Sequence, residues 1–237
     1  MAVAEAFLAA RFNRPGFEVV NHHTFAIVSD GDLMEGISHE AASLAGHYGL
    51  GKMIYLYDDN EITIDGSTSL AFTEDVTGRF EAYGWQVLDV SDGNDVEAID
   101  AAIREAKAET GKPSLIRVHT VIGFGSPNKA GKSSSHGSPL GQDEIVLTRK
   151  ELGWPDGATF HVPDGVSAHM QEIATRGKSA RQAWEDMMTR YASEHPDASA
   201  EWDRWMSGDM PSDLESFMPS FDEGSSVATR SANGKVL

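Results

Sequence analysis

The sequence contains no cysteine, which excludes disulfide bonds, thiolate metal centres and a cysteine nucleophile, and which fits a reducing compartment. Basic residues are also scarce, because 19 Lys and Arg stand against 37 Asp and Glu, for a formal net charge of −18. Such a chain repels the phosphates of nucleic acids and anionic lipids, since no cluster of cations offsets its charge. We therefore expect no nucleic-acid partner and no membrane partner.

Long hydrophobic runs are missing as well. No stretch approaches the ~18 apolar residues that a membrane span requires, and the first residues lack the basic and apolar segments of a secretory signal. These absences predict a soluble, cytoplasmic protein. With 237 residues, 40% of them hydrophobic, the chain is long enough for one α/β domain and an appendage.

The chain does contain an alternation of strand and helix patterns. Apolar runs, typical of strands covered on both faces, occupy residues 24–28 and 53–57, and residues 86–90 and 113–118 also read as strands. Helical spacing of apolar residues predicts helices at 1–12, 37–48, 75–83, 95–109, 179–195 and 199–206. Helices between strands imply βαβ crossovers, so we expect an α/β three-layer sandwich with a mainly parallel sheet, followed by a helical segment.

Polar turns follow two of these strands, thirty residues apart: Ser29-Asp30-Gly31 and Asp58-Asp59-Asn60. An open parallel sheet presents ligand groups at the carboxyl ends of its strands. Together the turns offer a carboxylate, an amide oxygen and a backbone carbonyl, a set that suits magnesium holding a diphosphate. A calcium-binding EF-hand is excluded, because Ser69 stands where that loop requires a glutamate. No dinucleotide-binding glycine motif and no P-loop is present.

These turns belong to longer segments that resemble the thiamine diphosphate fingerprint of the transketolase family. The segments are Asp30–Gly31, Met34–Ile37, Glu40–His47, Tyr57–Asn60, Ile62–Gly66, Phe72–Val76, Arg79–Trp85, Ile122–Ser126 and Ser135–Gly137. The resemblance runs over nearly the whole chain and is clearest from Leu8 to Trp154. It implies a pentose phosphate pathway enzyme that transfers a two-carbon ketol unit from a ketose phosphate to an aldose phosphate, with thiamine diphosphate as electron sink.

The resemblance also implies a role for each matching residue at the cation. The carboxylate of Asp30, the amide oxygen of Asn60 and the backbone carbonyl of Ile62 would bind Mg²⁺ or Ca²⁺. The cofactor diphosphate would complete the coordination shell, which agrees with the oxygen preference of these cations. Gly31 would let the backbone approach the diphosphate closely.

Four further residues have implied roles and an ordinary alternative each. Ile64 and Ile122 would form apolar walls for the thiazolium, although each isoleucine also fits an ordinary core residue. His136 would reach the diphosphate and the substrate, although a histidine in a Gly/Ser-rich loop is also typical of a solvated surface. Glu35 would join a carboxylate network at a dimer interface, although it also fits a helix N-terminus, where a negative charge is favourable.

Two features depart from the family pattern. Ser29 occupies a position that is usually glycine, which alters the turn before Asp30. In addition, the chain resembles only the later part of the diphosphate-binding domain, at residues 1–160, with a helical inter-domain linker at 161–221 and the start of a pyrimidine-binding domain at 222–237. The absent parts include a glycine-rich cofactor loop, substrate-binding histidines and the glutamate that protonates the cofactor. We therefore expect a homodimer in the full-length enzyme, or a complementing chain.

Two other functions remain open. The chain could belong to another thiamine diphosphate enzyme, such as a dehydrogenase E1 component or a deoxyxylulose phosphate synthase. The loop from Gly125 to Gly137 favours the transketolase branch. The chain could also be a non-catalytic fragment or assembly module, which the absence of cofactor binding would indicate.

Overall fold

The computed structural model describes residues 1–155, 157, 159–210 and 212–236. Two compact units make up the chain, Met1–Glu172 and Ile173–Leu237. The first unit contains the sheet and the second is helical. The domain boundaries at residues 160 and 221 stay predictions.

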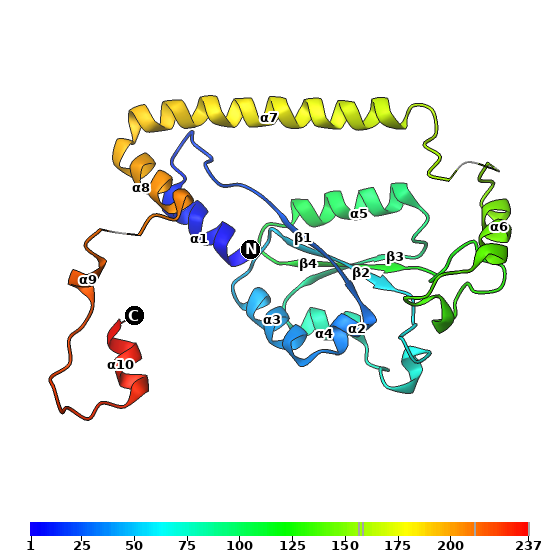
Figure 1. The fold of residues 1–237 in the computed structure, drawn as a ribbon, viewed down its shortest axis with the longest axis horizontal. Helices are drawn as coiled ribbons and strands as arrows, with labels where there is room; N and C mark the ends of the chain where they lie inside the picture. The colour runs from blue at the N-terminus through cyan, green and yellow to red at the C-terminus, as the bar shows by residue number, and fades with distance from the viewer. Residues whose placement is uncertain (156, 158, 211, 237) are drawn as a thin grey trace. The chain divides into compact units, whose positions relative to one another are not determined.

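Four parallel strands form the sheet of the first unit, in the order β1-β2-β4-β3. The strands are β1 (Thr24–Ser29), β2 (Met53–Asp59), β3 (Gln86–Val90) and β4 (Ser114–His119). All four coincide closely with the predicted segments. Because every strand runs in the same direction, the carboxyl ends of β1, β2 and β4 meet at one edge of the sheet (Figure 1).

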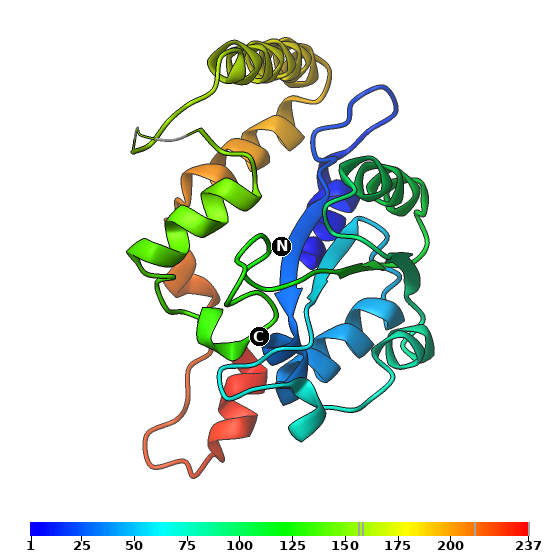
Figure 2. The same ribbon diagram turned by 90° about the vertical axis from the view of Figure 1, so that its right-hand side faces the viewer.

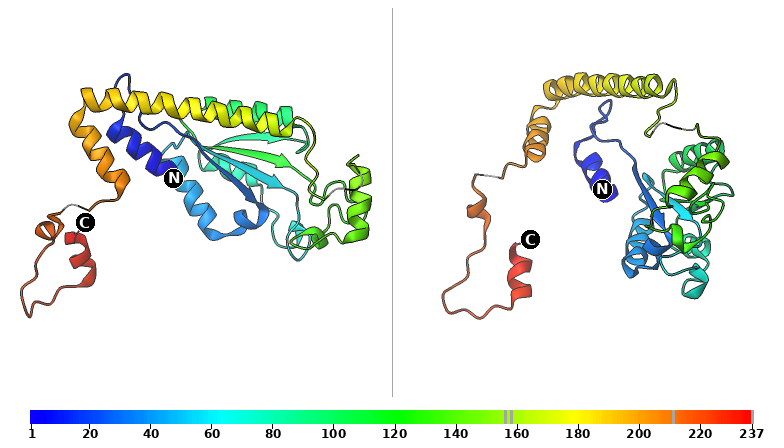
Figure 3. Two further views of the ribbon diagram at one scale, coloured as in Figure 1. Left: turned by 45° about the horizontal axis from the view of Figure 1, so that its top comes forward. Right: turned by 45° about the vertical axis from the view of Figure 1, so that its right-hand side comes forward.

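Helices cover both faces of this sheet. The helices of this unit are α1 (Ala2–Phe12), α2 (Asp30–Met34), α3 (Gly36–His47), α4 (Val76–Ala82), α5 (Val96–Ala108) and α6 (Gln142–Glu151), of which α3, α4 and α5 pack on the sheet. The helix α5 lies over one face, whereas α3 and α4 lie over the other (Figure 2). The views in Figure 3 show the same three layers. The predicted three-layer α/β sandwich is therefore confirmed.

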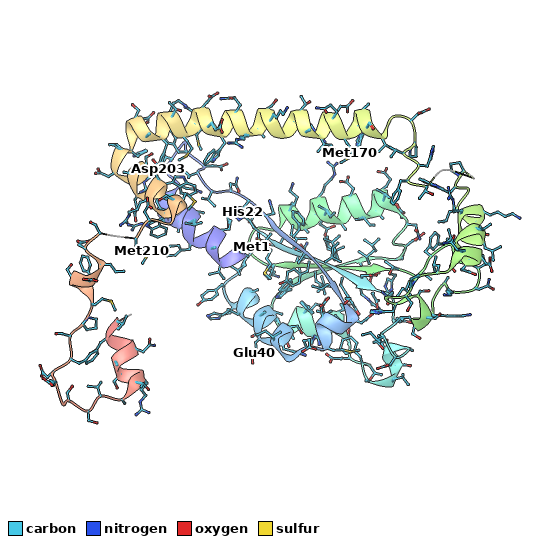
Figure 4. All side chains as sticks on the ribbon, viewed as in Figure 1. Met1, His22, Glu40, Met170, Asp203 and Met210 are labelled. Atoms are coloured by element: carbon cyan, nitrogen blue, oxygen red, sulfur yellow. The ribbon has the colours of Figure 1, made fainter. Side chains whose placement is uncertain are left out.

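Neighbouring residues of the central strands pack into two separate hydrophobic cores, one on each face of the sheet. Leu115 contributes to the core under α3 and α4, while the adjacent Ile116 contributes to the core under α5. This division follows from the strand geometry, since successive side chains point to opposite faces. Side chains fill the space between the sheet and its helices (Figure 4). Burial of one large apolar residue such as Phe80 contributes about 1.5–3 kcal/mol.

Close approach of backbone determines how α3 sits on the sheet. A Cβ atom at Gly46 would lie 1.8 Å from the carbonyl oxygen of Tyr83, so only glycine fits there. The indole N–H of Trp85 donates to the carbonyl of Ala42 on the same helix at 2.8 Å. These contacts hold α3, which follows the strand end that carries Asp30, at a definite place on the sheet.

The structure adds short helical segments to the first unit that were not predicted, among them the 3₁₀ helix Thr68–Leu70. Residues 30–34 form the short helix α2 rather than a simple turn. The helix α6 follows the glycine-rich loop and was not predicted. The loop itself contains one short 3₁₀ turn, Ser133–Ser135.

The second unit consists of helices. The helix α7 (Val166–Glu194) straddles the boundary between the units and has 29 residues, so it begins earlier than the predicted residue 179. It is followed by α8 (Pro196–Ser207), α9 (Leu214–Phe217) and α10 (Thr229–Val236). The proline at the first position of α8 and the left-handed Gly208 after it are typical helix boundaries. No helix in the described ranges has the length and apolarity needed to cross a membrane.

Candidate functional site

A cavity of about 1090 Å³ lies at the carboxyl ends of β1, β2 and β4. Its walls come from the loops that follow these three strands, which are far apart in the sequence. Six of the eight predicted site residues line it: Gly31, Asn60, Ile62, Ile64, Ile122 and His136. The parallel topology explains this convergence, since it places the three loops at one edge.

Asp30 lies beside this cavity, at the start of α2. Its side chain is buried, with 3% of the residue exposed, and it lines an adjoining pocket that shares Ser67 and Thr68 with the main cavity. The hydroxyl of Tyr57 donates to Asp30 Oδ1 at 2.5 Å. The other oxygen, Oδ2, is buried and has no hydrogen-bond partner in the described part of the chain. Burial raises the pKa of Asp30, the Tyr57 hydroxyl lowers it, and the nearby charge of Asp59 raises it further.

The turn after β2 carries the other two candidate ligands. The amide oxygen of Asn60 accepts from the backbone N–H of Ile62 at 3.0 Å, which closes the turn. Between them, Glu61 adopts a left-handed conformation with φ +58°, which is uncommon for a residue other than glycine. The backbone N–H of Glu61 interacts with the Asp30 carboxylate and lowers its pKa. The carboxylate therefore meets the turn at the residue that separates Asn60 from Ile62.

These features fit a hard cation. A buried carboxylate oxygen normally has a partner, because burial without one costs free energy. One carboxylate, one amide oxygen and one backbone carbonyl are ligands that Mg²⁺ and Ca²⁺ accept, with phosphate oxygens and water in the remaining positions. No group of three His, Cys, Asp or Glu side chains converges among the described residues, so an all-side-chain metal centre is not present there.

The strand end before Asp30 accommodates serine in place of the expected glycine. The backbone N–H and the hydroxyl of Ser29 both donate to Asp32 Oδ2, at 2.8 and 2.9 Å, and the bond from the backbone N–H is one half of a capping box for α2. A Cβ atom at Gly31 would meet only the Ser29 hydroxyl, at 3.9 Å, among the described residues. The backbone of Gly31 is thus open toward the cavity, where a ligand can approach it.

The two isoleucines and His136 form other parts of the cavity. Ile64 is 73% exposed, so the alternative that it is a core residue is wrong. Ile122 is partly buried and also lines the cavity. His136 is exposed and follows the 3₁₀ turn of the glycine-rich loop. These positions give the cavity apolar walls and one imidazole.

Hydrogen bonds from α6 hold the loop that carries His136. One carboxylate oxygen of Glu144 accepts from the Ser126 hydroxyl at 2.5 Å and from the Asn128 backbone N–H at 2.8 Å. The other accepts from the Asn128 side chain at 2.9 Å. These bonds lower the pKa of Glu144, with the Ser126 bond as the largest cause. The predicted long loop is therefore tied to the helix that follows it.

Comparison with known proteins identifies the family. Residues 1–211 match the family described as "Transketolase, thiamine diphosphate binding domain". The chain belongs to the transketolase family. This assignment confirms the resemblance drawn from the sequence motifs, and it favours the transketolase branch over the E1 and deoxyxylulose phosphate synthase alternatives.

Individual transketolases match the chain over its whole length. The transketolase of Halalkalibacterium halodurans is 48% identical over 237 residues, which are 100% of this chain and 35% of that protein. The transketolase of Streptococcus pyogenes is 50% identical over 238 residues, covering 100% and 32% of the two chains. A crystal structure of a transketolase mutant from Pichia stipitis superposes with a TM-score of 0.93, at 41% identity, over 99% of this chain and 35% of that one. The chain thus spans about a third of the length of these relatives.

The structure does not bring Glu35 to the cavity. This residue ends α2 and precedes α3, and its side chain is exposed. Within the described residues it makes no side-chain capping bond to α3. Its role in a carboxylate network with a second subunit of a transketolase stays a prediction.

Sequence reasoning missed a charged cluster beside the candidate cation site. Asp59 is 5% exposed, and its Oδ2 accepts from Arg117 Nε at 2.7 Å and lies 3.1 Å from His119 Nδ1. The other ring nitrogen of His119 lies 3.2 Å from Asp89 Oδ1. A sequence signal was available, because Tyr57 and Asp59 stand two residues apart in β2, so their side chains lie on the same face. Arg117 and His119 also stand two residues apart, on β4, the neighbouring strand in this transketolase domain, where they are paired with Tyr57 and Asp59.

Proposed function

We propose that this chain supplies the cation and diphosphate half of a transketolase-type active site. The reaction is the transfer of a two-carbon ketol unit from a ketose phosphate to an aldose phosphate. The observation that carries the proposal is the buried carboxylate of Asp30, whose Oδ2 lacks a partner among the described residues, beside the turn that holds Asn60 and Ile62. Membership in a family with a thiamine diphosphate binding domain supplies the context for that observation.

In this proposal Asp30, Asn60 and the Ile62 carbonyl hold Mg²⁺ or Ca²⁺. The cation neutralises a diphosphate that a chain with a net charge of −18 would otherwise repel. The open backbone at Gly31 allows the diphosphate to approach closely. Thiamine diphosphate, when bound, supplies the electron sink for cleavage and formation of the carbon–carbon bond.

The rest of the cavity would surround the cofactor and the substrate. Ile64 and Ile122 exclude water from the side of the thiazolium, and His136 donates to the diphosphate or to the substrate from its loop. Crystal structures of the Pichia stipitis transketolase include complexes with xylulose 5-phosphate and sedoheptulose 7-phosphate. Sugar phosphates are therefore the substrates that we propose for this chain.

A second subunit is part of the proposal. Three apolar residues of the α3 segment, Ile37, Leu44 and Tyr48, are exposed, and Glu35 immediately precedes this helix. Exposed apolar surface of this kind is typical of a subunit interface. We propose that it contacts a second copy of the transketolase polypeptide, either in the full-length homodimer or in a complementing chain.

The proposal is tested by titrating the 237-residue chain with thiamine diphosphate in the presence and absence of Mg²⁺, by calorimetry. We expect Mg²⁺-dependent binding that Asp30→Ala abolishes. Asp100→Ala is the control, because it removes one carboxylate from the exposed surface of α5. Equal binding by Asp30→Ala would overturn the site. No binding by the wild-type chain, even with a complementing chain, would favour the assembly-module alternative.

A further inference from the structure

Tyr57 lies between two buried carboxylates. Its hydroxyl is 2.5 Å from Asp30 Oδ1 and 3.3 Å from Asp59 Oδ1. All three residues are buried at the carboxyl ends of β1 and β2. A phenol has a single proton to donate, so the two carboxylates compete for it.

The surroundings of Asp59 decide this competition. Arg117 and His119 approach its Oδ2 from β4, at 2.7 and 3.1 Å. Asp89 in turn lies 3.2 Å from the far nitrogen of His119, which orients the imidazole. Because Arg117 and His119 already compensate the charge of Asp59, Asp59 is a weaker acceptor for the Tyr57 hydroxyl than Asp30 is.

The phenol remains a donor under these conditions. The shorter of its two contacts is the one to Asp30, so the proton is directed there. This bond occupies Oδ1 and prevents free rotation of the carboxylate.

We propose that Tyr57 is a positioning residue for the cation, which anchors Asp30 Oδ1 so that Oδ2 is presented as the ligand. The cluster of Asp59, Arg117 and His119 supports it by leaving the Tyr57 proton to Asp30. The inference rests on the proposed cation site. Groups that orient a metal ligand typically change metal affinity about 10- to 100-fold when they are removed.

The chain offers a matched control for this inference. Tyr55 lies two residues earlier on β2 and faces the same side of the sheet, where it packs against Trp85 at a ring-centroid distance of 5.2 Å. Replacing Tyr55 with phenylalanine removes one hydroxyl from the same strand without touching Asp30. Any general effect of losing a phenol oxygen is therefore measured separately.

The test is a titration of the 237-residue chain with Mn²⁺ in the presence of thiamine diphosphate, followed by electron paramagnetic resonance of the free ion. We expect Tyr57→Phe to weaken Mn²⁺ binding about 10-fold or more, and Tyr55→Phe to change it less than about 2-fold. Thermal unfolding without cation is recorded for both variants, because a purely structural role would lower the melting temperature and leave the Mn²⁺ affinity of the folded protein unchanged. Equal Mn²⁺ affinity of Tyr57→Phe and wild type would overturn the inference.

A second variant keeps the inference testable if Tyr57→Phe does not fold. Arg117→Gln removes the cation from Asp59, so Asp59 competes for the Tyr57 proton and Mn²⁺ binding weakens. Arg117→Lys retains a cation and is expected to restore part of the affinity. Wild-type affinity in Arg117→Gln would contradict the role of the cluster. If the wild-type chain itself bound no Mn²⁺, the proposed cation site would fail, whereas a failure confined to the variants would overturn only the role of Tyr57.

Discussion

Two buried aspartates at the same edge of the sheet have opposite environments. Asp59, at the end of β2, has Arg117 and His119 as partners. Asp30, at the start of α2, has the Tyr57 hydroxyl and the Glu61 backbone N–H, and its Oδ2 has no partner within the described ranges. Both side chains are almost fully buried.

In the proposed function, the difference separates a carboxylate that the protein itself compensates from one that binds a ligand. A buried charge is stable only when a partner compensates the loss of water. For Asp59 the protein itself supplies that partner, from the neighbouring strand. For Asp30 it does not, and the raised pKa of Asp30 reflects that deficit, with burial as its main cause. We infer that an external cation completes the environment of Asp30.

The largest expected effect comes from Asp30→Asn. This change removes the negative charge from the candidate ligand set, so we expect cation affinity to fall more than about 100-fold, beyond the range typical of groups that only orient a ligand. The free energy of unfolding without cation should stay the same or rise, because a poorly compensated buried carboxylate is lost. Calorimetry with Mg²⁺ and urea unfolding in EDTA measure the two quantities. If Asp30→Asn bound the cation as tightly as wild type, the proposed difference between Asp30 and Asp59 would be refuted.

Asp59→Asn should show the reverse behaviour. It leaves Arg117 and His119 facing a neutral amide, so we expect a loss of about 1–3 kcal/mol in the free energy of unfolding. The value lies below that of a fully buried pair, because the Arg117 side chain is 32% exposed and water screens it. Asp89→Asn is the control, since that carboxylate is largely exposed. Urea unfolding without cation measures this free energy. A variant Asp59→Asn that is as stable as wild type would refute the distinction between the two aspartates.

Glu144 sharpens the comparison, because neutral hydrogen-bond donors compensate most of its charge, with a smaller effect from the charge of Lys129. The hydrogen bonds from Ser126 and Asn128 lower its pKa below the ordinary 4.5. A carboxylate with a lowered folded-state pKa stabilises the protein above pH 4.5, and this stabilisation is lost as the pH falls through the folded-state value. Glu144→Gln should therefore be less stable than wild type at pH 7, and the difference should shrink in acid. Urea unfolding at a series of pH values measures this, and a difference independent of pH would argue against it.

The smallest effect on stability is expected at the edge of the sheet. Among the described residues β1 pairs with β2 alone, and Phe25 on this strand is 48% exposed. An unpaired apolar edge promotes association. We expect Phe25→Thr to reduce self-association in sedimentation experiments and to change the free energy of unfolding by less than about 0.5 kcal/mol. Val28→Thr is the control, because Val28 packs against the core and its replacement should destabilise the fold. A wild-type chain that sediments as a single monomeric species would contradict the prediction.

Local patterns in the sequence predicted most of the first unit. Two of the four strands were visible as apolar runs, the other two as short segments rich in apolar residues, and α5 as an amphipathic repeat, because burial of a strand or a helix face is a property of nearby residues. The helix α2 was missed because its capping box, Ser29 with Asp32, has the same composition as a turn. The first turns of α7 were missed although Val166, Met170 and Ile173 stand at helical spacing, so a sequence signal for them was available.

The sequence by itself determined the family, the fold class and six of the residues that line the cavity, since the motifs stand directly after the strands whose ends build it. Only the tertiary structure decided which of the two buried aspartates is paired with basic side chains of the protein. The order β1-β2-β4-β3 places Arg117 and His119 beside Asp59, although 58 residues separate Arg117 from that aspartate. That pairing depends on which strand inserts next to β2, and a preference between strands so far apart is not encoded in any local pattern. The same order places Asp30 at the end of β1, which pairs with β2 alone among the described residues, whereas Arg117 and His119 on β4 form their ion pairs with Asp59.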